Sequence, residues 1–431
     1  MSFDTALGTL FSTLGTALGA LAFAACALVV GYLLVFALAS RRLRPTPSQI
    51  APSQRLAVFI PAYKEDAVIV DVARQALDQS YPQDLYEVIV IADSLQPATL
   101  AALDALPIQV VEVSFEKSTK AKALNAALSL LAAQKQAFDV AVVLDADNVM
   151  DRHALAHLAA HLDPDRLEQR ALVVQGQRVA KNLDTPMAKL DALSEGINNQ
   201  IFRAGHANLG LSAALIGSGM AFDYALFDRC MNRAEAVGGF DKELELMLLR
   251  EGLRIAWAPE AVIYDEKVSG GQTFENQRTR WLSAQFHYLR RHAARGFAAL
   301  FQGRFDYADK VFQMALPPRA LLIAGVPALT VVAFVLGGPT AGLPWAVLTL
   351  ALVLALFIAI PASLLRSDIL SAVLHLPGGI WRMVRALFRS PSGNRTFIHT
   401  PHGAGSQVTG PASQVRTSAA PETTADLRPS T

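Results

Sequence analysis

Charged residues and cysteines are both scarce in this chain of 431 residues. Asp, Glu, Lys and Arg make up 17% of the sequence against 52% hydrophobic residues, which is too apolar on average for one soluble domain, so we expect membrane segments. Two cysteines, Cys26 and Cys230, cannot form a disulfide framework, and we interpret both as reduced thiols. The formal net charge of +1 provides no basic field, so charge gives no support for nucleic-acid binding.

Two common nucleotide-binding signatures are also missing. No G-x-G-x-x-G follows the first predicted strand, and no P-loop occurs anywhere in the chain. A Rossmann dehydrogenase and a P-loop NTPase are therefore not indicated.

A long uncharged run lies near the N-terminus. Residues 5–40 carry no charge, and residues 17–39 are long enough for a bilayer span of about 20 residues. A cleaved signal peptide is the alternative, but Asp4 stands where a basic segment is expected and the run exceeds the usual ~7–15 residues. We expect residues 1–44 to be an uncleaved anchor. Because Arg41, Arg42 and Arg44 follow the run, the positive-inside rule places the rest of the chain in the cytoplasm.

A second uncharged run lies between Arg319 and Arg366 and is interrupted by glycine and proline at residues 337–344. We predict two membrane spans over residues 319–366, joined by a tight turn. Before them, residues 293–318 interleave apolar and basic side chains as in an interfacial helix, although an ordinary amphipathic helix fits this pattern as well. Residues 367–389 suggest another interfacial helix, and the composition of residues 390–431 predicts a disordered tail.

Between the apolar runs, residues 53–292 alternate between strand-like and helix-like periodicity. Strands are predicted at residues 56–61, 88–92, 110–113, 140–144 and 172–175. Helices are predicted between them, at about residues 67–79, 97–106 and 120–134. This order predicts an α/β domain with a mostly parallel, Rossmann-like sheet covered by helices on both faces.

Polar side chains follow several of these strands. Asp145 and Asp147 come directly after the apolar strand at residues 140–144, at the sheet edge where open α/β folds bind ligands. Two carboxylates there can hold a metal ion, although solvated acids also end many strands. Tyr63, Glu65 and Asp93 occupy corresponding positions after two other strands.

Several motifs occur along the chain in a fixed order. They are Pro61-Ala62-Tyr63-Lys64-Glu65, Asp93, Lys120-Ala121-Lys122-Ala123-Leu124-Asn125, Asp145-Ala146-Asp147, Lys242-Glu243 and Gln277-Arg278-Thr279-Arg280-Trp281. In this order and spacing they resemble the membrane-bound family 2 glycosyltransferases, the group of cellulose, hyaluronan and poly-N-acetylglucosamine synthases. The resemblance covers about residues 55–281 and continues into the membrane segments. It implies a GT-A nucleotide-diphospho-sugar transferase domain with about three transmembrane helices and interfacial helices.

The resemblance also implies roles for individual residues. Those implied to bind a UDP-sugar are Pro61, Tyr63, Glu65, Asp93, Lys120, Asp145 and Arg280. Asp147, with Asp145, is implied to hold Mg²⁺ or Mn²⁺, which prefer oxygen ligands. The acceptor is implied to lie against Gly217, Ser218, Gln277 and Trp281, because glycines allow close approach and a tryptophan offers a flat face to a sugar. Lys64 departs from the family, which has asparagine at that position.

The general base is less clearly indicated. The family's Glu-Asp pair aligns with Lys242-Glu243, which makes Glu243 the expected catalytic carboxylate and replaces the preceding acid by lysine. Asp241 is the rival, and Glu245 is a further nearby acid. If the segment is helical, Asp241 and Glu245 share a face because they are four residues apart, whereas Glu243 points elsewhere.

The sequence thus predicts an inverting, metal-dependent transfer of a sugar from a UDP-sugar donor to a glycan acceptor, in polysaccharide synthesis at the inner (plasma) membrane. The expected protein is multi-pass, with its catalytic domain in the cytoplasm and in contact with the lipid bilayer. Because three spans are few for a sugar channel, homo-oligomers or export subunits are possible partners; single-sugar transfer to a lipid-linked acceptor is the alternative. A non-catalytic nucleotide-binding membrane regulator is a third interpretation. Nucleic acid is not an expected partner.

Overall fold

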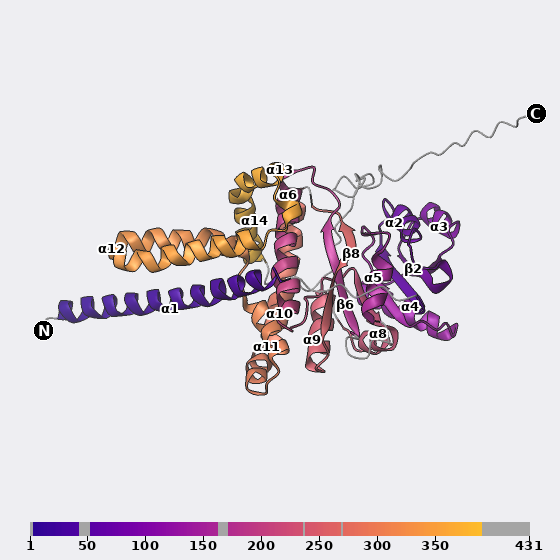
Figure 1. The fold of residues 1–431 in the computed structure, drawn as a ribbon, viewed down its shortest axis with the longest axis horizontal. Coiled ribbons are helices and arrows are strands. Elements are labelled where there is room, and N and C mark those ends of the chain that lie inside the picture. The colour runs from indigo at the N-terminus through magenta and orange to yellow at the C-terminus, as the bar shows by residue number, and fades with distance from the viewer. Residues whose placement is uncertain (1–2, 43–51, 163–170, 236–237, 269, 390–431) are drawn as a thin grey trace, which may run out of the picture.

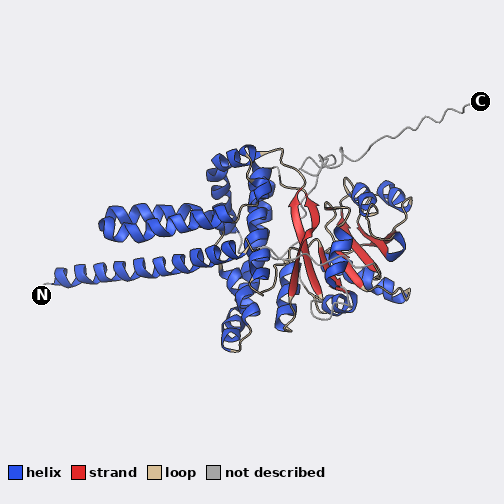
Figure 2. Ribbon diagram, viewed as in Figure 1, coloured by secondary structure: helices blue, strands red, loops and turns tan. Residues whose placement is uncertain are grey.

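The computed structural model describes residues 3–42, 52–162, 171–235, 238–268 and 270–389. An eight-stranded sheet with the order β3-β2-β1-β4-β7-β6-β8-β5 forms the centre of the α/β part (Figure 1). Its strands are β1 (Leu56–Tyr63), β2 (Tyr86–Asp93), β3 (Gln109–Val113), β4 (Val140–Val143), β5 (Val149–Met150), β6 (Val173–Ala180), β7 (Met220–Asp223) and β8 (Ile255–Asp265). The strands lie in one half of the molecule, and the other half is helical (Figure 2).

The helices up to residue 250 are α1 (Phe3–Ala39), α2 (Ile69–Ala76), α3 (Pro97–Asp104), α4 (Lys120–Ala133), α5 (Ala154–Leu162), α6 (Pro186–Asn198), α7 (His206–Asn208), α8 (Tyr224–Met231) and α9 (Phe240–Arg250). The later ones are α10 (Gly271–Phe301), α11 (Phe305–Ala315), α12 (Arg319–Ile358), α13 (Ser367–Leu370) and α14 (Leu376–Arg389). A π-helical segment, η2 (Asn199–Gly205), continues α6. Short 3₁₀ turns cover Gln83–Leu85, Ala362–Leu364 and Ser371–His375.

The predicted α/β architecture is confirmed, and the sheet is mixed, with four parallel and three antiparallel strand pairs among the described residues. β1, β2, β3 and β4 pair in parallel, as do β6 and β8. β7 lies between β4 and β6, runs antiparallel to both, and leads directly into α8 at Asp223. The short β5 also pairs antiparallel, with β8.

Alternate residues of β1 belong to two different core layers. Leu56, Val58 and Ile60 pack on one face of the sheet with side chains of α2 and α5. Ala57 and Phe59 pack on the other face with side chains of α4, α8 and α9. Successive side chains of a strand point to opposite faces of the sheet. Because both faces are covered here, both sets are apolar and the strand is a continuous apolar run.

The long apolar helices lie side by side and project away from the sheet (Figure 1). α12 consists of two helical halves that meet at Gly338, whose φ of 67° interrupts the helix. The halves run antiparallel, since the Thr330 and Thr349 hydroxyls lie 2.8 Å apart. The turn therefore falls within the segment at residues 337–344 that the sequence indicates. By length and composition, residues 15–39 and α12 qualify as membrane-crossing helices.

α10 runs without a break past residue 292, where the sequence suggested that an interfacial segment begins. α11 and α14 both pack along it. Part of residues 293–318 is thus the end of the same helix that carries Gln277 and Trp281. The predicted disordered tail at residues 390–431 and the linker arginine Arg44 lie outside the described residues.

Candidate active site

One cavity of about 930 Å³ collects most of the residues that the sequence singles out. Its lining includes Pro61, Tyr63, Glu65, Asp93, Lys120, Asp145, Asp147, Gly217, Asp241, Gln277, Arg280 and Trp281. The first seven come from the C-terminal ends of β1, β2 and β4 and from the start of α4. The last four come from α9 and α10, which close the opposite side. Ser218 and Glu243 are absent from this lining.

The turn after β1 places Glu65 in the cavity. Lys64 adopts a left-handed conformation, with φ of 56°, and its backbone N–H donates to the Asp93 carbonyl at 3.1 Å. This conformation is tolerated best by asparagine among residues with a side chain, so the position that departs from the family pattern is also a strained one. Glu65 is 8% exposed and Asp93 is 2% exposed, so both carboxylates are buried at the cavity wall.

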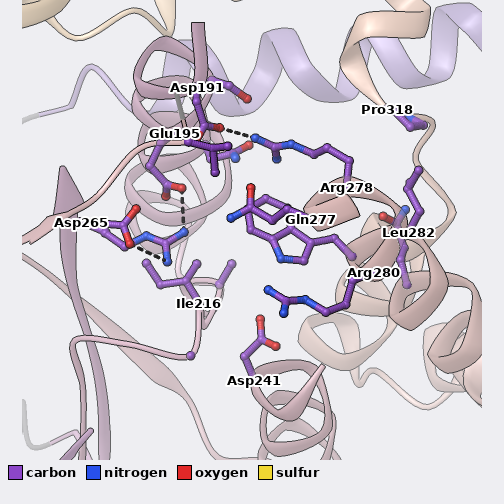
Figure 3. A pocket seen from close by; sticks show the side chains of 18 of the residues that line it. Asp191, Glu195, Ile216, Asp241, Asp265, Gln277, Arg278, Arg280, Leu282 and Pro318 are labelled. Atoms are coloured by element: carbon purple, nitrogen blue, oxygen red, sulfur yellow. Dashed lines mark hydrogen bonds and ion pairs between the residues drawn. The ribbon is translucent and has the colours of Figure 1, made fainter. Parts of the chain in front are cut away.

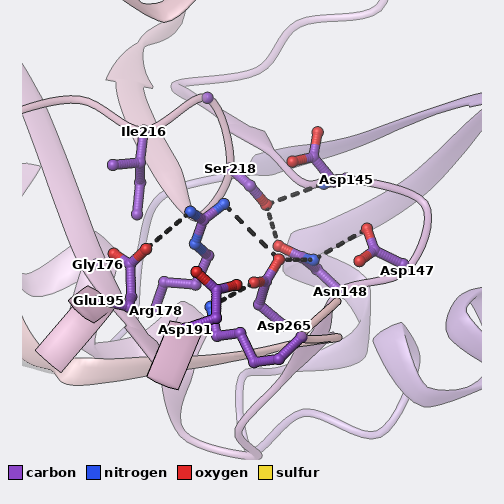
Figure 4. Close-up of polar contacts among 12 residues, drawn as sticks. Asp145, Asp147, Asn148, Gly176, Arg178, Asp191, Glu195, Ile216, Ser218 and Asp265 are labelled. Carbon is purple, nitrogen blue, oxygen red and sulfur yellow. Dashed lines mark hydrogen bonds and ion pairs between the residues drawn. The ribbon is translucent and has the colours of Figure 1, made fainter. Parts of the chain in front are cut away.

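A buried hydroxyl fixes the turn that carries the two aspartates. Ser218 is fully buried; its hydroxyl accepts from the Asp145 backbone N–H at 2.9 Å and donates to the Asn148 side-chain oxygen at 2.5 Å. Asn148 in turn donates to Asp147 and Asp265, each at 3.1 Å (Figure 4). Ser218 therefore positions the turn from behind and does not contact the cavity, where an acceptor role was expected.

The glycine beside Ser218 has a different function. Gly217 has φ of 84°, a conformation that residues with a Cβ rarely adopt. Its carbonyl accepts a 2.7 Å hydrogen bond from the Lys120 ammonium. The glycine thus exposes a backbone carbonyl to the cavity and helps to aim Lys120.

Lys120 and Asp145 form an ion pair at the cavity wall. The Nζ–Oδ1 distance is 2.5 Å, and Lys120 is the first residue of α4, which Thr119 caps through the Lys122 N–H. The N-terminus of a helix and a lysine together make an anion-binding corner. Lys120 is thus placed where a phosphate can compete with Asp145 for its ammonium group.

α9 separates the three candidate bases by helical geometry. Asp241 and Glu245 line the cavity, four residues apart on one face. Glu243 lies on another face, and its carboxylate accepts from the Glu235 N–H at 3.1 Å. Glu245 is 3% exposed, pairs with Lys310 at 2.9 Å and accepts from the Leu215 N–H at 3.0 Å, so it is committed to structure. The structure thus brings Asp241, and not the preferred Glu243, into the site.

α10 supplies the residues on the opposite wall. Figure 3 shows Arg280 directed toward Asp241, with Gln277 between this pair and the ion pair of Arg278 with Asp191. Burial lowers the pKa of Arg280, and the negative charges of Asp145 and Asp241 oppose that shift. The Arg278 guanidinium carbon lies 4.3 Å from the centre of the Trp281 ring, so one face of the indole is covered.

A charge network in the cavity wall was not found by sequence reasoning. Glu195 accepts from Arg178 at 3.0 Å and from Arg203 at 3.1 Å. Burial favours protonation of Glu195, but the positive charges of Arg178 and Arg203 outweigh it and hold its pKa well below the ordinary value. Arg178 also approaches Asp265 at 3.6 Å, which links the network to Asn148 (Figure 4). The only sequence signal was the four-residue spacing of Asp191 and Glu195 on α6.

Asp145 and Asp147 suit a hard divalent cation. Both offer carboxylate oxygens to the cavity, and Asp147 is 6% exposed. Within the described residues no group of three His, Cys, Asp or Glu side chains is placed to hold a metal ion. Asp145 and Asp147 would thus be the protein ligands among the described residues, and substrate phosphates and water would complete an Mg²⁺ or Mn²⁺ shell.

Comparisons with known proteins agree with this geometry. The domain described as "Glycosyltransferase like family 2" matches residues 52–284. The probable glycosyltransferase YdaM of Bacillus subtilis is 23% identical over 248 residues, which are 56% of this chain and 58% of the relative. The match therefore spans less than two thirds of that relative's length.

Solved glycosyltransferases align with this chain at low sequence identity. The mannosyltransferase PcManGT from Pyrobaculum calidifontis, in complex with GDP-mannose and Mn²⁺, aligns with a TM-score of 0.49 and 20% identity over 88% of this chain and 98% of its own. Glucosyl-3-phosphoglycerate synthase from Mycobacterium tuberculosis, in complex with Mn²⁺, UDP and phosphoglyceric acid, aligns with a TM-score of 0.34 and 18% identity over 52% and 77% of the two chains.

Proposed function

The chain belongs to glycosyltransferase family 2, and from that membership we propose that its cavity transfers a sugar from a UDP-sugar to an acceptor at a membrane, with inversion at the anomeric carbon. One observation carries this proposal. A diphosphate corner at Lys120, an aspartate pair at Asp145 and Asp147, and a carboxylate at Asp241 facing Arg280 all line the same cavity. These are the groups that leaving-group binding and acceptor activation require.

The donor fits the end of the cavity formed by the strand termini. Glu65 and Asp93 offer carboxylate oxygens that accept hydrogen bonds from an imide N–H or from ribose hydroxyls. Lys120 and Arg280 supply positive charge for the two phosphates, and arginine can form two parallel hydrogen bonds to a phosphate.

Asp145 and Asp147 are the residues proposed to hold Mg²⁺ or Mn²⁺. Such an ion neutralises negative charge on a departing diphosphate. In the present arrangement Lys120 is the partner of Asp145 at 2.5 Å, so Asp145 can exchange its ammonium contact for a cation when phosphates engage Lys120.

Asp241 is proposed as the general base. The bond between the anomeric carbon and the diphosphate oxygen breaks, the acceptor oxygen forms its bond from the opposite side of that carbon, and the acceptor proton passes to the Asp241 carboxylate. The UDP leaves with both electrons of the broken bond. Asp241 suits this step because it faces the cavity, where Glu243 does not. Arg280 lies beside it and orients the carboxylate.

The long apolar helices are proposed to span a bilayer. Many large apolar side chains of α1 and α12 are exposed, including Leu21, Val335 and Leu336, which is unlike the core helices of soluble proteins. With Arg41 and Arg42 at the end of α1, the positive-inside rule places the catalytic domain in the cytoplasm, where nucleotide sugars are made.

Two kinds of product fit this proposal. Gln277, Arg280 and Trp281 favour a processive synthase that extends a glycan, with oligomers or further subunits for export. Transfer of a single sugar to a lipid-linked acceptor is the second possibility, because α1 and the two halves of α12 are few helices for a channel. A non-catalytic nucleotide-binding regulator is a weaker candidate, since the cavity retains a base-like Asp241 opposite the donor end.

Release of UDP tests the proposal. Purified full-length protein in detergent, given labelled UDP-sugars with Mg²⁺ or Mn²⁺, should release UDP, and Asp147→Asn should abolish release. Asp151→Asn is a matched control, because Asp151 follows the same turn but lies outside the cavity lining. Release that persists in Asp147→Asn would refute the metal assignment. UDP binding without release from any donor would favour the regulator.

A further inference from the structure

The cavity continues beyond the catalytic groups into an apolar half. That half lies between α6, α12 and α14 and is lined by Leu193, Ile323, Leu356, Phe357, Ile380 and Met383. The total volume of about 930 Å³ is at the upper end of the ~300–1,000 Å³ typical of small-ligand pockets. A polar nucleotide sugar does not account for the apolar half of this volume. Of the three helices around the apolar half, α12 is also proposed to enter the membrane.

Arg319 stands at the boundary between the two halves. It is the first residue of α12, and its Nη2 donates to the carbonyl and the hydroxyl of Ser194 at 3.0 and 2.9 Å. Its other terminal nitrogen, Nη1, is buried and has no hydrogen-bond partner within the described part of the chain. A buried guanidinium nitrogen without a hydrogen-bond partner costs free energy, and a bound anion would satisfy it.

The carboxylates near Arg319 are already paired. Asp191 binds Arg278, and Glu195 is shared by Arg178 and Arg203. Within the described residues, no ion pair of Arg319 with an acid is found. Because no acid of the described residues completes the site, we assign this anion to a ligand.

The space between Arg319 and the base is suited to a sugar. Gln277 projects into it between the Arg278–Asp191 pair and Arg280 (Figure 3), and its side-chain oxygen is buried without a partner in the described structure. Trp281 lines the same space. An unsatisfied amide oxygen next to an aromatic ring can accept from a sugar hydroxyl while the ring packs on the sugar face.

We propose that the acceptor is a lipid-linked sugar whose anionic phosphate headgroup binds Arg319. Its hydrocarbon chain lies in the apolar half between α6, α12 and α14, its phosphate meets Arg319, and its sugar lies against Gln277 and Trp281 with one hydroxyl toward Asp241. This inference rests on the proposed function, whose acceptor it specifies. Neither the end of a polysaccharide nor a free phosphate has apolar groups that would occupy the apolar half of the cavity.

Binding measurements on full-length protein in detergent separate these ligands. The probes are farnesyl phosphate, farnesol, inorganic phosphate and a chitin hexasaccharide. Farnesyl phosphate should bind at least tenfold more tightly than farnesol, and inorganic phosphate and the hexasaccharide should bind more weakly than either lipid. Equal affinity for farnesol and farnesyl phosphate would overturn the headgroup site. If inorganic phosphate bound as tightly as farnesyl phosphate, the lipid assignment would be overturned. Tighter binding of the hexasaccharide than of farnesyl phosphate would overturn it as well.

Variants at the boundary test the role of Arg319. Arg319→Gln should reduce affinity for farnesyl phosphate about tenfold, to that of farnesol, and Arg319→Lys should recover most of the difference. Arg366→Gln is the matched control, because Arg366 is largely exposed, pairs with Asp368 at 3.5 Å and lies outside the cavity lining. Ile323→Trp, which fills the apolar half, should weaken both lipids. Arg319→Gln with unchanged preference for farnesyl phosphate would refute the proposal.

UDP is titrated into each variant in parallel. UDP binding reports on the donor end of the cavity, so the native protein's failure to bind UDP would refute the proposed function. The selectivity between farnesyl phosphate and farnesol tests only the class of acceptor. The two failures are therefore distinguishable.

Discussion

Asp241 and Glu243 lie two residues apart on α9, yet only Asp241 faces the cavity. A separation of two residues turns a helical side chain by about 200°, so the two carboxylates cannot serve one substrate. Because Glu243 instead accepts from the Glu235 backbone, its contribution is to the packing of α9 against the preceding loop.

The base assignment can be tested with this pair. Asp241→Asn should lower the rate of sugar transfer by about 10²–10⁴-fold, since it removes the proton acceptor, and should leave UDP binding intact. Glu243→Gln is the matched control and should retain at least a third of the rate. Steady-state UDP release and a UDP titration measure both effects. If Glu243→Gln abolished sugar transfer while Asp241→Asn remained active, Glu243 would be the base, as the sequence alignment suggested.

The Lys120–Asp145 ion pair predicts selective loss of diphosphate binding. Lys120→Gln should weaken UDP about tenfold or more, because a hydrogen bond to a charged group contributes about 1.5–3 kcal/mol, and should leave uridine affinity unchanged. Lys122→Gln is the control, since the Lys122 ammonium bonds the Lys117 carbonyl at the exposed start of the same helix. Calorimetric titration with UDP and uridine measures the ratio. An equal loss for both ligands would place Lys120 in folding rather than in phosphate binding.

The sequence indicated the cavity residues at the strand ends more directly than it indicated the strand order. Asp93, Asp145 and Asp147 each follow an apolar strand directly, so their positions at one sheet edge follow from local pattern and parallel pairing. β7 has only four residues. Its pairing with β4 joins segments more than 70 residues apart in the chain, and no local pattern reveals such a contact.

The same limit explains the misplaced roles. Ser218 was expected at the acceptor because residues 217–219 resemble a glycine-rich segment of the family, but its hydroxyl bonds Asp145 and Asn148, which are 73 and 70 residues away. For the base, helical periodicity already separated Glu243 from Asp241, whereas the motif alignment favoured Glu243. The physical pattern was the better guide to which acid faces the cavity.

Ser218 predicts a stability effect that is separate from substrate contact. Ser218→Ala leaves the Asn148 oxygen and the Asp145 N–H without their buried partner, so it should cost about 1–3 kcal/mol of unfolding free energy. Ser129→Ala is the control: its hydroxyl bonds the Asn125 carbonyl at an exposed site, and the change should stay within about 0.5 kcal/mol. Denaturant unfolding in detergent measures both. Equal stability of Ser218→Ala and the native protein would contradict this role.

His292 predicts how stability depends on pH. Burial, with the positive charges of Arg250, Arg291 and Arg295, lowers its pKa from 6.5 to about 4, and its Nδ1 lies 2.7 Å from the Tyr307 hydroxyl between α10 and α11. Between these two pH values the unfolded chain binds a proton that the folded chain does not, so this contribution is complete above pH 6.5 and declines toward pH 4. His292→Gln should therefore flatten the fall of the melting temperature over that window. His153→Gln, at an exposed site beside Ser80, should leave the slope unchanged. If the melting temperature of His292→Gln fell with decreasing pH as steeply as that of the native protein, other groups would govern stability in this pH range.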